Sequence, residues 1–507
     1  MKRTIIVFIS IIFLIKIYFY IKFPFYETDN LDFINYANAF KNIIFGNFHE
    51  NPLLFYWVSP LYPIILSLFA IINIKLIIAQ RVLAFMLDIG TLYFFYKYNE
   101  KLFPKVKWLS LLLYSLSPIL IYSTHMAISG SLYLFLFSTF LYFVYSKPDS
   151  ILCSFIVSCL YLTRPEGIFY IPVYGYFLFR GSKKLKYLYL SILFIIPYMA
   201  FLWSFSDDPT ISIKSRIFIK EANLYYQKYI ETGKDSPQFR SEFFDKGSWI
   251  FRDNNVINKS IEKNILKTPI FKSKETLVLT MKTYIFWLIE IIKYYFYMQP
   301  LFYIFLIFAG IFISDKKLII QQSIFLLPII TYPLASFWTK VDSNEVRHFM
   351  FLELLIIPYV SNYLLLLYNI RLKKSILYIV FSSFLCFFFM SPYYFESMKA
   401  NVYIINRIFE KELLKFNLKG KVLMSRDPWL PYTENSKWEN IILFDDEFQK
   451  KLLELNVDYI ALGQRYSYFF DHSLYFKNGI PKYLKQVYKK KIKGVECILY
   501  KVNKNLL

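Results

Sequence analysis

Three carboxylates lie within six residues, directly after the first apolar stretch of the chain (residues 4–23). They are Glu27, Asp29 and Asp32. A carboxyl group beside apolar walls loses hydration, and this tunes its pKa toward that of a general base. Asp29 and Asp32 are therefore candidate catalytic residues. The alternative is structural: one of the two would be the solvated N-cap of a helix over 33–45.

Two arginines later in the chain have surroundings suited to binding an anion. Arg164 stands between two apolar stretches, with Glu166 beside it. A guanidinium removed from water needs an anionic partner, which is either Glu166 from within or a phosphate from outside. Arg347 and His348 form a donor pair suited to a phosphate near lipid headgroups. An arginine that merely extends to the membrane surface is the simpler alternative for Arg347.

Three further ionisable residues carry weaker signals. Arg81 and Asp88 are seven residues apart in one apolar stretch, which places them on one helix face two turns apart. Mutual support within a helix bundle is the simpler interpretation of this pair. His125 stands alone and is interpreted as structural.

Several familiar motifs of catalysis are absent from the sequence. It contains no Gly-x4-Gly-Lys-Ser/Thr loop, no dinucleotide fingerprint, no His-Glu-x-x-His and no nucleophile elbow. No spacing indicates a metal site, and the four cysteines are interpreted as buried thiols. No cofactor is indicated with certainty, and dependence on a divalent metal stays open. Any group transfer must therefore use a donor that arrives already activated in the membrane.

These residues are set in a strongly apolar chain. Of 507 residues, 56% are hydrophobic and 21% are aromatic. They occur in blocks rather than at the period of a soluble helix or strand, which predicts an α-helical polytopic membrane protein. The net charge of +23 does not indicate a nucleic-acid partner, because Lys and Arg gather in the short breaks between blocks.

The apolar blocks predict about eleven transmembrane helices. The expected spans are residues 4–23, 74–96, 108–122, 132–145, 151–163, 168–179, 187–203, 301–313, 318–338, 349–370 and 375–390. The first is expected to be a retained helix, because its apolar stretch is too long for a signal peptide and no small-residue cleavage site follows. The fifth and sixth are short. We expect them to form a hairpin, because a merged span would place Arg164 and Glu166 inside the membrane.

The charges in the short connections predict an orientation. With alternating spans and a cytoplasmic N-terminus, six inside segments hold 16 Lys and Arg residues, whereas three short outside loops hold 3. Basic residues concentrate on the cytoplasmic side of membrane proteins. The sequence therefore predicts a multi-pass protein of the plasma membrane with its N-terminus in the cytoplasm.

Three regions are then expected on the extracytoplasmic side. Residues 24–73 form an outer loop with a short interfacial helix, and residues 204–300 form an insertion whose last part is another interfacial candidate. Residues 1–391 make up the membrane module. Residues 392–507 are expected to form a soluble α/β domain with a strand over 457–462.

The residues on the expected outer side resemble a known pattern. The matching pieces are Asp32, Tyr36, Ala39, Ile43 and Gly46 in the spacing Asp-x3-Tyr-x2-Ala-x3-Ile-x2-Gly, then Pro60-Leu61-Tyr62-Pro63, Arg81-Val82-Leu83, Ser117-Pro118, Thr163-Arg164-Pro165-Glu166-Gly167 and Arg347-His348-Phe349. In order and sidedness they resemble the GT-C class of membrane glycosyltransferases. The branch is that of the dolichyl-phosphate-mannose protein mannosyltransferases and the aminoarabinose transferases that modify lipid A. The resemblance covers nearly the whole chain, and it includes the C-terminal segments 422–433 and 457–462.

The resemblance implies transfer of a sugar from a polyprenyl-phosphate carrier to an acceptor hydroxyl, with inversion, on the outer face of the membrane. Asp32 matches the catalytic acid of the family's first outer loop and would orient and deprotonate the acceptor, which is a glycan, a lipid or a protein. Arg347, His348 and Arg164 would stabilise the phosphate as it leaves. Three further side chains would support the site: Tyr36, Glu166 and Arg81.

The sequence departs from the family pattern in the second outer loop. An acidic residue usually stands there near the start of the fourth helix, but this chain has Ile128-Ser129-Gly130-Ser131. A second acid or a metal ligand is therefore missing unless Asp29 or Glu166 replaces it. The chain also has no Trp-Trp-Asp-Tyr-Gly motif, which argues against the relatives that glycosylate asparagine.

Two other functions remain open from the sequence. An oligosaccharide polymerase or ligase of the cell envelope would depend on Arg216, Arg240 and Arg252 in the large insertion and would leave Asp32 dispensable. A transporter or flippase for lipid-linked sugars would instead show internal repeats and matched helix breaks near the midplane. We find no such repeat in the sequence.

Overall fold

The structure is a computed structural model. It describes residues 10, 13–14, 16–18, 28–46, 59–117, 120–121, 129–181, 184–204, 231, 274–298, 301–327, 350–369, 409, 412–425, 437–439, 448–462, 480–492 and 495–507. The chain divides into two compact units. The first comprises Met1–Phe25, Asp32–Leu224 and Lys263–Met398, and the second comprises Tyr26–Leu31, Tyr225–Glu262 and Lys399–Leu507. Each is described by itself below.

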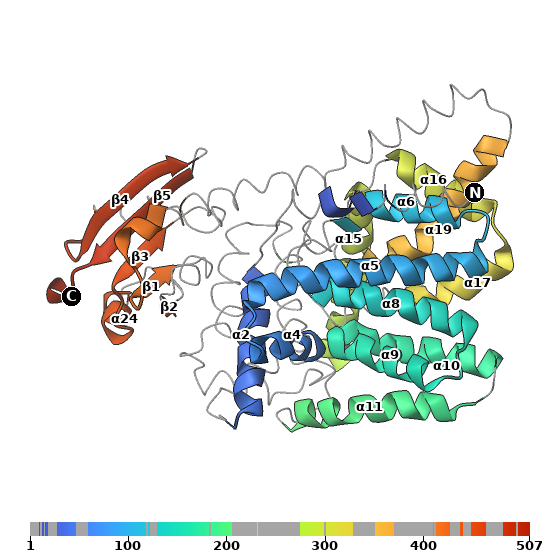
Figure 1. Ribbon diagram of the computed structural model, residues 1–507, viewed down its shortest axis with the longest axis horizontal. Coiled ribbons are helices and arrows are strands. Elements are labelled where there is room, and N and C mark those ends of the chain that lie inside the picture. The colour runs from blue at the N-terminus through green and yellow to red at the C-terminus, as the bar shows by residue number, and fades with distance from the viewer. Residues whose placement is uncertain are drawn as a thin grey trace. The chain divides into compact units, whose positions relative to one another are not determined.

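The first unit contains a bundle of apolar helices, several of which run nearly parallel to one another (Figure 1). Its members are α5 (Leu76–Leu102), α6 (Lys107–Leu116), α8 (Ser129–Ser146), α9 (Ile151–Thr163), α10 (Tyr170–Arg180), α11 (Lys186–Trp203), α16 (Leu301–Phe312), α17 (Lys316–Ser323) and α19 (Met350–Asn369). Among the described residues, four helices are long and apolar enough to cross a membrane, namely α5, α8, α11 and most of α19. The described chain is thus mostly helical, with candidate membrane spans.

Helices that follow one another in the chain alternate in direction. Gly90 of α5 packs against Phe135 of α8, and Tyr98 packs against Tyr145 further along both helices, so α5 and α8 are parallel. Tyr96 of α5 contacts Trp108 at the start of α6, so those two helices are antiparallel. We call the end of the bundle at which α6 and α9 finish and α5, α8 and α10 begin the turn end.

Helices α9 and α10 form the hairpin that the sequence indicated. They have 13 and 11 residues, and the 3₁₀ turn η1 (Pro165–Phe169) joins them. The hydroxyl of Ser150 caps α9 by accepting the N–H of Cys153 at 3.1 Å. At 1.5 Å per residue, each arm is shorter than the ~30 Å core of a bilayer.

Three expected spans have different bounds in the structure. The second, expected to end at residue 96, continues as α5 to Leu102. The third begins as α6, which ends at Leu116, and residues 120–121 are again helical. The ninth begins as α17, whose N-cap Asp315 accepts the N–H of Lys317 at 2.9 Å. A 3₁₀ turn, η3 (Ile324–Leu326), follows α17 directly, and most of this expected span lies outside the described residues.

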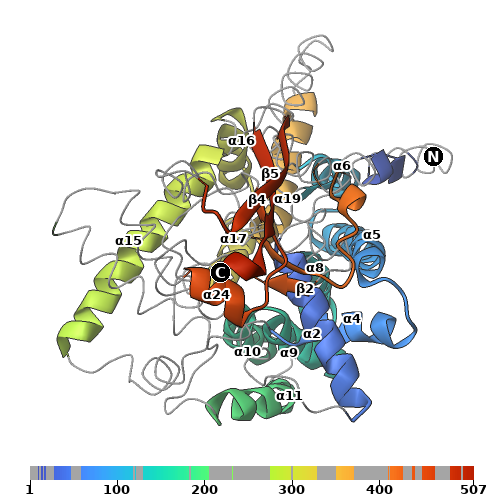
Figure 2. The same cartoon turned by 90° about the vertical axis from the view of Figure 1, so that its left-hand side faces the viewer.

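Three helices lie in the expected outer regions of the sequence. They are α2 (Thr28–Ile44), α4 (Leu61–Ile71) and α15 (Lys274–Met298). Figure 2 shows helix α15 from the side and α5, α8 and α10 nearly end-on, so α15 runs crosswise to these bundle helices. Its exposed apolar residues follow helical spacing: Leu277, Val278, Met281, Ile285, Ile289 and Ile292. This arrangement suits a helix that lies along an apolar boundary.

From Phe409 onward, the described part of the second unit is a small α/β sheet. Its strand order is β2 (Lys437–Glu439), β1 (Val422–Ser425), β3 (Tyr459–Leu462), β5 (Val495–Val502) and β4 (Leu484–Ile492). The first three strands are parallel, and β5 runs antiparallel to both β3 and β4. Helix α24 (Phe448–Glu454) precedes β3. The expected C-terminal sheet, with a strand near 457–462, is therefore confirmed.

Candidate active site

The Thr-Arg-Pro-Glu-Gly segment folds into a tight turn at the turn end of the bundle. Pro165 opens η1, where its missing N–H costs nothing. Gly167 donates its N–H to the carbonyl of Arg164 at 2.9 Å. A Cβ on Gly167 would come within 2.2 Å of the carbonyl carbon of Leu160. Only glycine lets this turn close onto the last turn of α9, so Gly167 fixes where Arg164 and Glu166 lie.

Arg164 and Glu166 form a buried ion pair. The Nε of Arg164 lies 2.8 Å from Oε1 of Glu166, with side-chain exposures of 9% and 2%. Of the two anionic partners considered for Arg164, Glu166 or an external phosphate, the structure shows Glu166.

Aromatic side chains surround this ion pair. The guanidinium carbon of Arg164 lies 5.4 Å from the ring centroid of Tyr133 in α8. Tyr133 and Tyr170 are fully buried, with ring centroids 6.5 Å apart. Phe351, in the first turn of α19, lies 6.3 Å from each of these rings. Four helices, α8, α9, α10 and α19, thus meet around Arg164.

The tyrosines of this cluster were missed from the sequence. Tyr133 and Tyr170 stand in apolar blocks and look like core residues there. The available signal was positional, because each stands in the first turns of a helix that begins at the turn end. Arg347 and His348, the predicted phosphate-binding pair, lie outside the described residues, a few positions before Met350, where α19 starts.

Helix α2 carries the predicted acids. It begins at Thr28, so Asp29 and Asp32 stand within its first two turns. The structural alternative that made either residue an N-cap is therefore wrong, because the helix starts before both. Their side chains lie outside the part of the chain that the structure describes.

The rest of the α2 pattern has a structural explanation. Tyr36 and Ala39 are 5% and 1% exposed, so they form a buried stripe. Gly46 ends the helix with φ +82°, a conformation that favours glycine. Phe33 packs edge-on against Tyr62 of α4 at 5.0 Å between ring centroids, and α4 in turn packs against α9. The start of α2 is thereby linked to the hairpin that bears Arg164.

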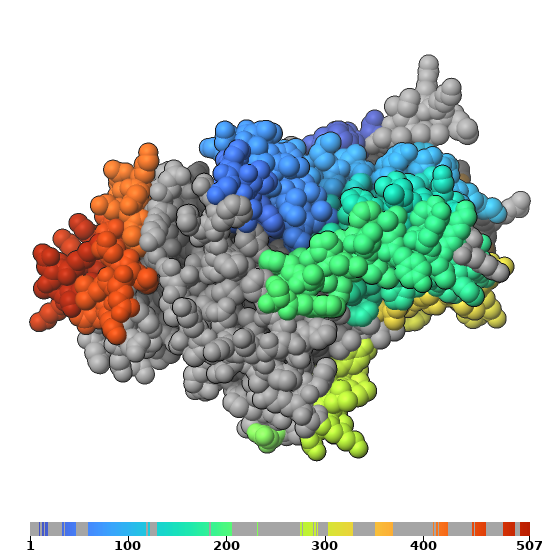
Figure 3. Space-filling model, turned by 90° about the horizontal axis from the view of Figure 1, so that it is seen from below, coloured from blue at the N-terminus to red at the C-terminus, as the bar shows by residue number. Residues whose placement is uncertain are grey.

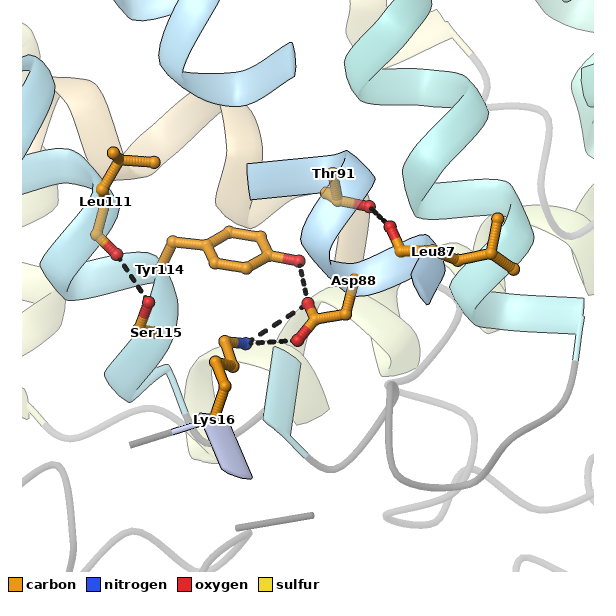
Figure 4. A network of polar contacts seen from close by, with 7 residues as sticks. All are labelled: Lys16, Leu87, Asp88, Thr91, Leu111, Tyr114 and Ser115. Carbon is orange, nitrogen blue, oxygen red and sulfur yellow. Dashed lines mark hydrogen bonds and ion pairs between the residues drawn. The ribbon is translucent and has the colours of Figure 1, made fainter. Parts of the chain in front are cut away.

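A second buried charge cluster lies within the bundle (Figure 4). The Nζ of Lys16, in the N-terminal helical segment, lies 3.0 Å from Oδ2 of Asp88 in α5. The hydroxyl of Tyr114 in α6 donates to Oδ1 of Asp88 at 2.7 Å. The ammonium of Lys16 also lies 4.5 Å from the centroid of the Tyr114 ring. We call these three residues the Lys16 triad.

The Lys16 triad changes the interpretation of Asp88. The sequence suggested mutual support between Arg81 and Asp88, whereas the partners of Asp88 that the structure shows are Lys16 and Tyr114. Lys16 was missed, although a lone cation in an apolar stretch is a signal. All three side chains are nearly inaccessible, and both oxygens of the carboxylate are engaged. The triad therefore ties three helices together, and Arg81 stays a predicted supporting residue.

Other buried polar contacts join the helices elsewhere in the bundle. Tyr303 of α16 donates to Glu353 of α19 at 2.7 Å. Tyr359 of α19 donates to Gln322 of α17 at 2.6 Å, and the amide of Gln322 donates to Tyr98 of α5. These contacts fix the packing of α19, the helix whose first turn reaches the Arg164 cluster.

No cluster of His, Cys, Asp and Glu among the described residues could hold a metal ion. Cys153, Cys159 and Cys497 are free and buried, and Cys386 lies outside the described residues. At the start of α8, where the family pattern has an acid, Gly130 and Ser131 are buried. No family model matches this chain, and no curated protein matches it.

The geometry defines what the cluster at the turn end can do chemically. It offers a guanidinium next to a carboxylate, in surroundings with little water, where charge–charge interactions are strong. Such a site can bind an anion if the anion competes with Glu166 or adds to it. The guanidinium of Arg164 makes anion binding the chemistry that the described contacts support best.

Proposed function

We propose that this chain is a glycosyltransferase of the GT-C kind. It moves a sugar from a polyprenyl-phosphate carrier to an acceptor hydroxyl on the outer face of the plasma membrane, with inversion at the anomeric carbon. The observation that carries the proposal is that two pieces of the family pattern, far apart in the sequence, lead to the same place, the turn end of the bundle. The Thr-Arg-Pro-Glu-Gly turn and the start of α19, which follows Arg347 and His348, belong to one packed cluster.

Chain length supports a shared anion site for Arg164 and Arg347. Phe351 stands four positions after Arg347, and four steps along the chain span at most about 14 Å. Phe351 lies against Tyr133, whose ring faces Arg164. Two guanidinium groups and His348 would stabilise the negative charge that develops on the leaving phosphate.

Asp32 is proposed as the base. It would accept the proton of the acceptor hydroxyl while the oxygen attacks the anomeric carbon and the bond to the carrier phosphate breaks. Asp29 is the second acid of the same helix start. The contact between Phe33 and Tyr62, together with the packing of α4 against α9, supports a position of this helix start near the hairpin. Tyr36, Glu166 and Arg81 are the proposed supporting residues.

The donor needs no nucleotide-binding domain, because its sugar is already activated on the phosphate. Apolar helix surfaces suit a polyprenyl tail, and exposed apolar residues of α11 such as Leu193 and Ile196 provide such surfaces. The acceptor belongs to the cell envelope and is a glycan, a lipid or a protein.

The proposal is tested by comparing envelope glycans, lipids and proteins by mass spectrometry in cells that lack the chain and cells that carry variants. We expect Asp32→Asn to abolish a sugar modification that the native chain restores, because the base is lost while the side-chain volume is kept. Asp149→Asn is the matched control. Asp149 pairs with Lys184 in the connections at the opposite end of the bundle, at 2.8 Å, so this variant should restore the modification fully.

Two outcomes would reject the assignment. Full activity of Asp32→Asn at native expression would exclude Asp32 as the base. Loss of activity in Arg216, Arg240 or Arg252 variants, with Asp32 dispensable, would favour the polymerase or ligase function. Those three arginines lie outside the described residues.

A further inference from the structure

Two lysines face each other across the C-terminal sheet. Lys485 of β4 is the direct cross-strand partner of Lys501 of β5 in the antiparallel register. Directly opposed residues of an antiparallel pair share one face of the sheet, with their Cβ atoms about 5 Å apart. Both side chains are exposed. Like charges in this position destabilise a sheet, so the pair needs an explanation.

Protection of the sheet edge against pairing with another chain explains Lys485 but not Lys501. Strand β4 is the last strand of the sheet, and lysines on an edge strand discourage pairing with another chain. Lys485 fits that role. Lys501 does not, because β5 lies between β3 and β4 and has no open edge.

Other lysines of the same unit are neutralised by carboxylates. On the same sheet face, Lys490 lies 2.8 Å from Glu412, which also pairs with Lys415. At the end of the sheet near Lys501, Lys504 lies 2.8 Å from Asp458. Within the described residues, no ion pair involves Lys485 or Lys501. Three nearby lysines thus have carboxylate partners, whereas the opposed couple has none among the ion pairs of the described residues.

The C-terminal part of the unit carries a net positive charge. From Phe409 onward, the described residues include 13 lysines and 5 acidic residues. Lys421 and Lys482 are exposed and flank the same end of the sheet, beside the starts of β1 and β4. Together with Lys485 and Lys501 they form what we call the lysine cluster. A surface of this kind fits an anionic partner.

We propose that the lysine cluster is a docking site for the phosphate headgroups of anionic phospholipids, which holds the C-terminal unit on the membrane surface. The same chain carries helices able to cross a membrane, so the unit is tethered next to a bilayer. Tethering makes the contact intramolecular and raises the effective concentration of headgroups. Each lysine near an anionic surface contributes about 1 kcal/mol to binding. A few such contributions can hold a tethered domain on the membrane, whereas a soluble polyanion at low concentration gains nothing from the tether.

The test uses the full chain in lipid nanodiscs. A fluorophore is attached at Asn505→Cys, an exposed position just beyond the end of β5, the strand that carries Lys501, and its quenching by spin-labelled headgroups reports docking. We expect stronger quenching in nanodiscs with phosphatidylglycerol than in nanodiscs with phosphatidylcholine alone. The difference should shrink as salt is raised, because exposed charges are screened.

The matched variants remove equal charge from two places. Lys485→Gln/Lys501→Gln should lower the ratio of docked to undocked unit about tenfold or more. Lys415→Gln/Lys490→Gln removes two lysines that Glu412 already neutralises, and it should leave docking nearly unchanged. Hydrogen exchange of β5 amides verifies that both variants keep the sheet.

Three results would overturn the proposal. The first is equal quenching in the two lipid mixtures, and the second is an equal loss in both double variants with β5 intact. The third is a response to soluble polyphosphate in phosphatidylcholine nanodiscs together with no response to phosphatidylglycerol. That last result would assign the lysine cluster to a soluble polyanion.

Discussion

At the scale of single residues, the buried charges decide how the bundle holds together. Lys16, Asp88 and Tyr114 form a closed set in which every charged atom has a partner (Figure 4). Removing one partner from a buried ion pair leaves an uncompensated charge, whereas replacing both with apolar groups is often neutral or stabilising. The Lys16 triad is therefore sensitive to single changes and tolerant of a matched double change.

We expect Lys16→Met to lower the stability of the detergent-solubilised protein by about 3–5 kcal/mol, and Lys16→Met/Asp88→Leu to recover most of the loss. Thermal unfolding of the single and double variants measures the coupling. Lys75→Met is the control, because Lys75 is exposed just before α5. Additive effects of the two substitutions would show that the pair is not coupled.

Asp458 has a comparable role in the C-terminal sheet. One oxygen of its carboxylate accepts the N–H of Val422 at 2.9 Å, and the other accepts Lys504 at 2.8 Å. Burial by itself would raise the pKa of Asp458, but these hydrogen bonds and the nearby lysines lower it below the ordinary value of 3.8. The carboxylate therefore stabilises the fold at pH values above 3.8, and this contribution is lost as the pH falls through the folded-state pKa.

We predict that Asp458→Asn lowers the protection of β1 and β3 amides from hydrogen exchange at neutral pH, by an amount that corresponds to about 1–3 kcal/mol. The gap between native and variant protein should narrow as the pH falls below 3.8, because the native carboxyl then becomes neutral too. Glu454→Gln is the control, since Glu454 is 60% exposed and 3.9 Å from Lys450. A gap that stays constant with pH would contradict the charge-based explanation.

At the scale of elements, two close helix contacts depend on glycines, one of which faces a backbone and the other an aromatic ring. A Cβ on Gly310 of α16 would lie 2.3 Å from the backbone carbonyl oxygen of Tyr359 in α19. A Cβ on Gly90 of α5 would lie 2.6 Å from a ring atom of Phe135. A backbone cannot move without shifting a helix, whereas a ring can rotate away. The contact of α16 with α19 therefore tolerates no side chain at position 310.

Gly310→Ala should accordingly lower the stability of the bundle by roughly 1–3 kcal/mol, the usual cost of overpacking. Gly90→Ala should lower it less. The matched pair shares the same added methyl group, so helix propensity affects both equally. Melting temperatures of the two variants in the same detergent decide the matter. If Gly90→Ala were the more harmful change, the packing of α16 on α19 would not be the limiting contact.

At the scale of the whole molecule, the function depends on which side of the membrane the turn end faces. The proposal requires the turn end and the C-terminal unit on the outer side. It also requires the opposite end, rich in lysines such as Lys101, Lys105 and Lys147, in the cytoplasm. The bias of Lys and Arg between connections predicts this orientation.

We predict that a membrane-impermeant maleimide labels Phe45→Cys and Asn505→Cys in intact cells, and labels Lys105→Cys only after permeabilisation. All three positions are exposed, and the cysteines that the structure describes are buried. Each substitution is made in a background that lacks Cys386. Labelling of Lys105→Cys in intact cells would invert the topology and remove the basis for an outer-face transferase.

The sequence by itself determined the apolar helical class, the hairpin around Arg164 and the C-terminal strand near 457–462. These depend on local pattern, because block length, charge and β-branched alternation act within a few residues of each other. The Gly167 turn was visible as a motif for the same reason.

The tertiary structure alone decided which side chains meet. Asp88 has Lys16 and Tyr114 as partners, from helices distant in the sequence, and Arg164 lies beside Tyr133 of α8. An apolar block gives no sign of which of its faces meets a neighbour, since lipid-facing and core-facing residues are equally hydrophobic there. Helix contacts within such a bundle are therefore set by packing and by a few buried polar groups, and these become apparent only once the helices are assembled.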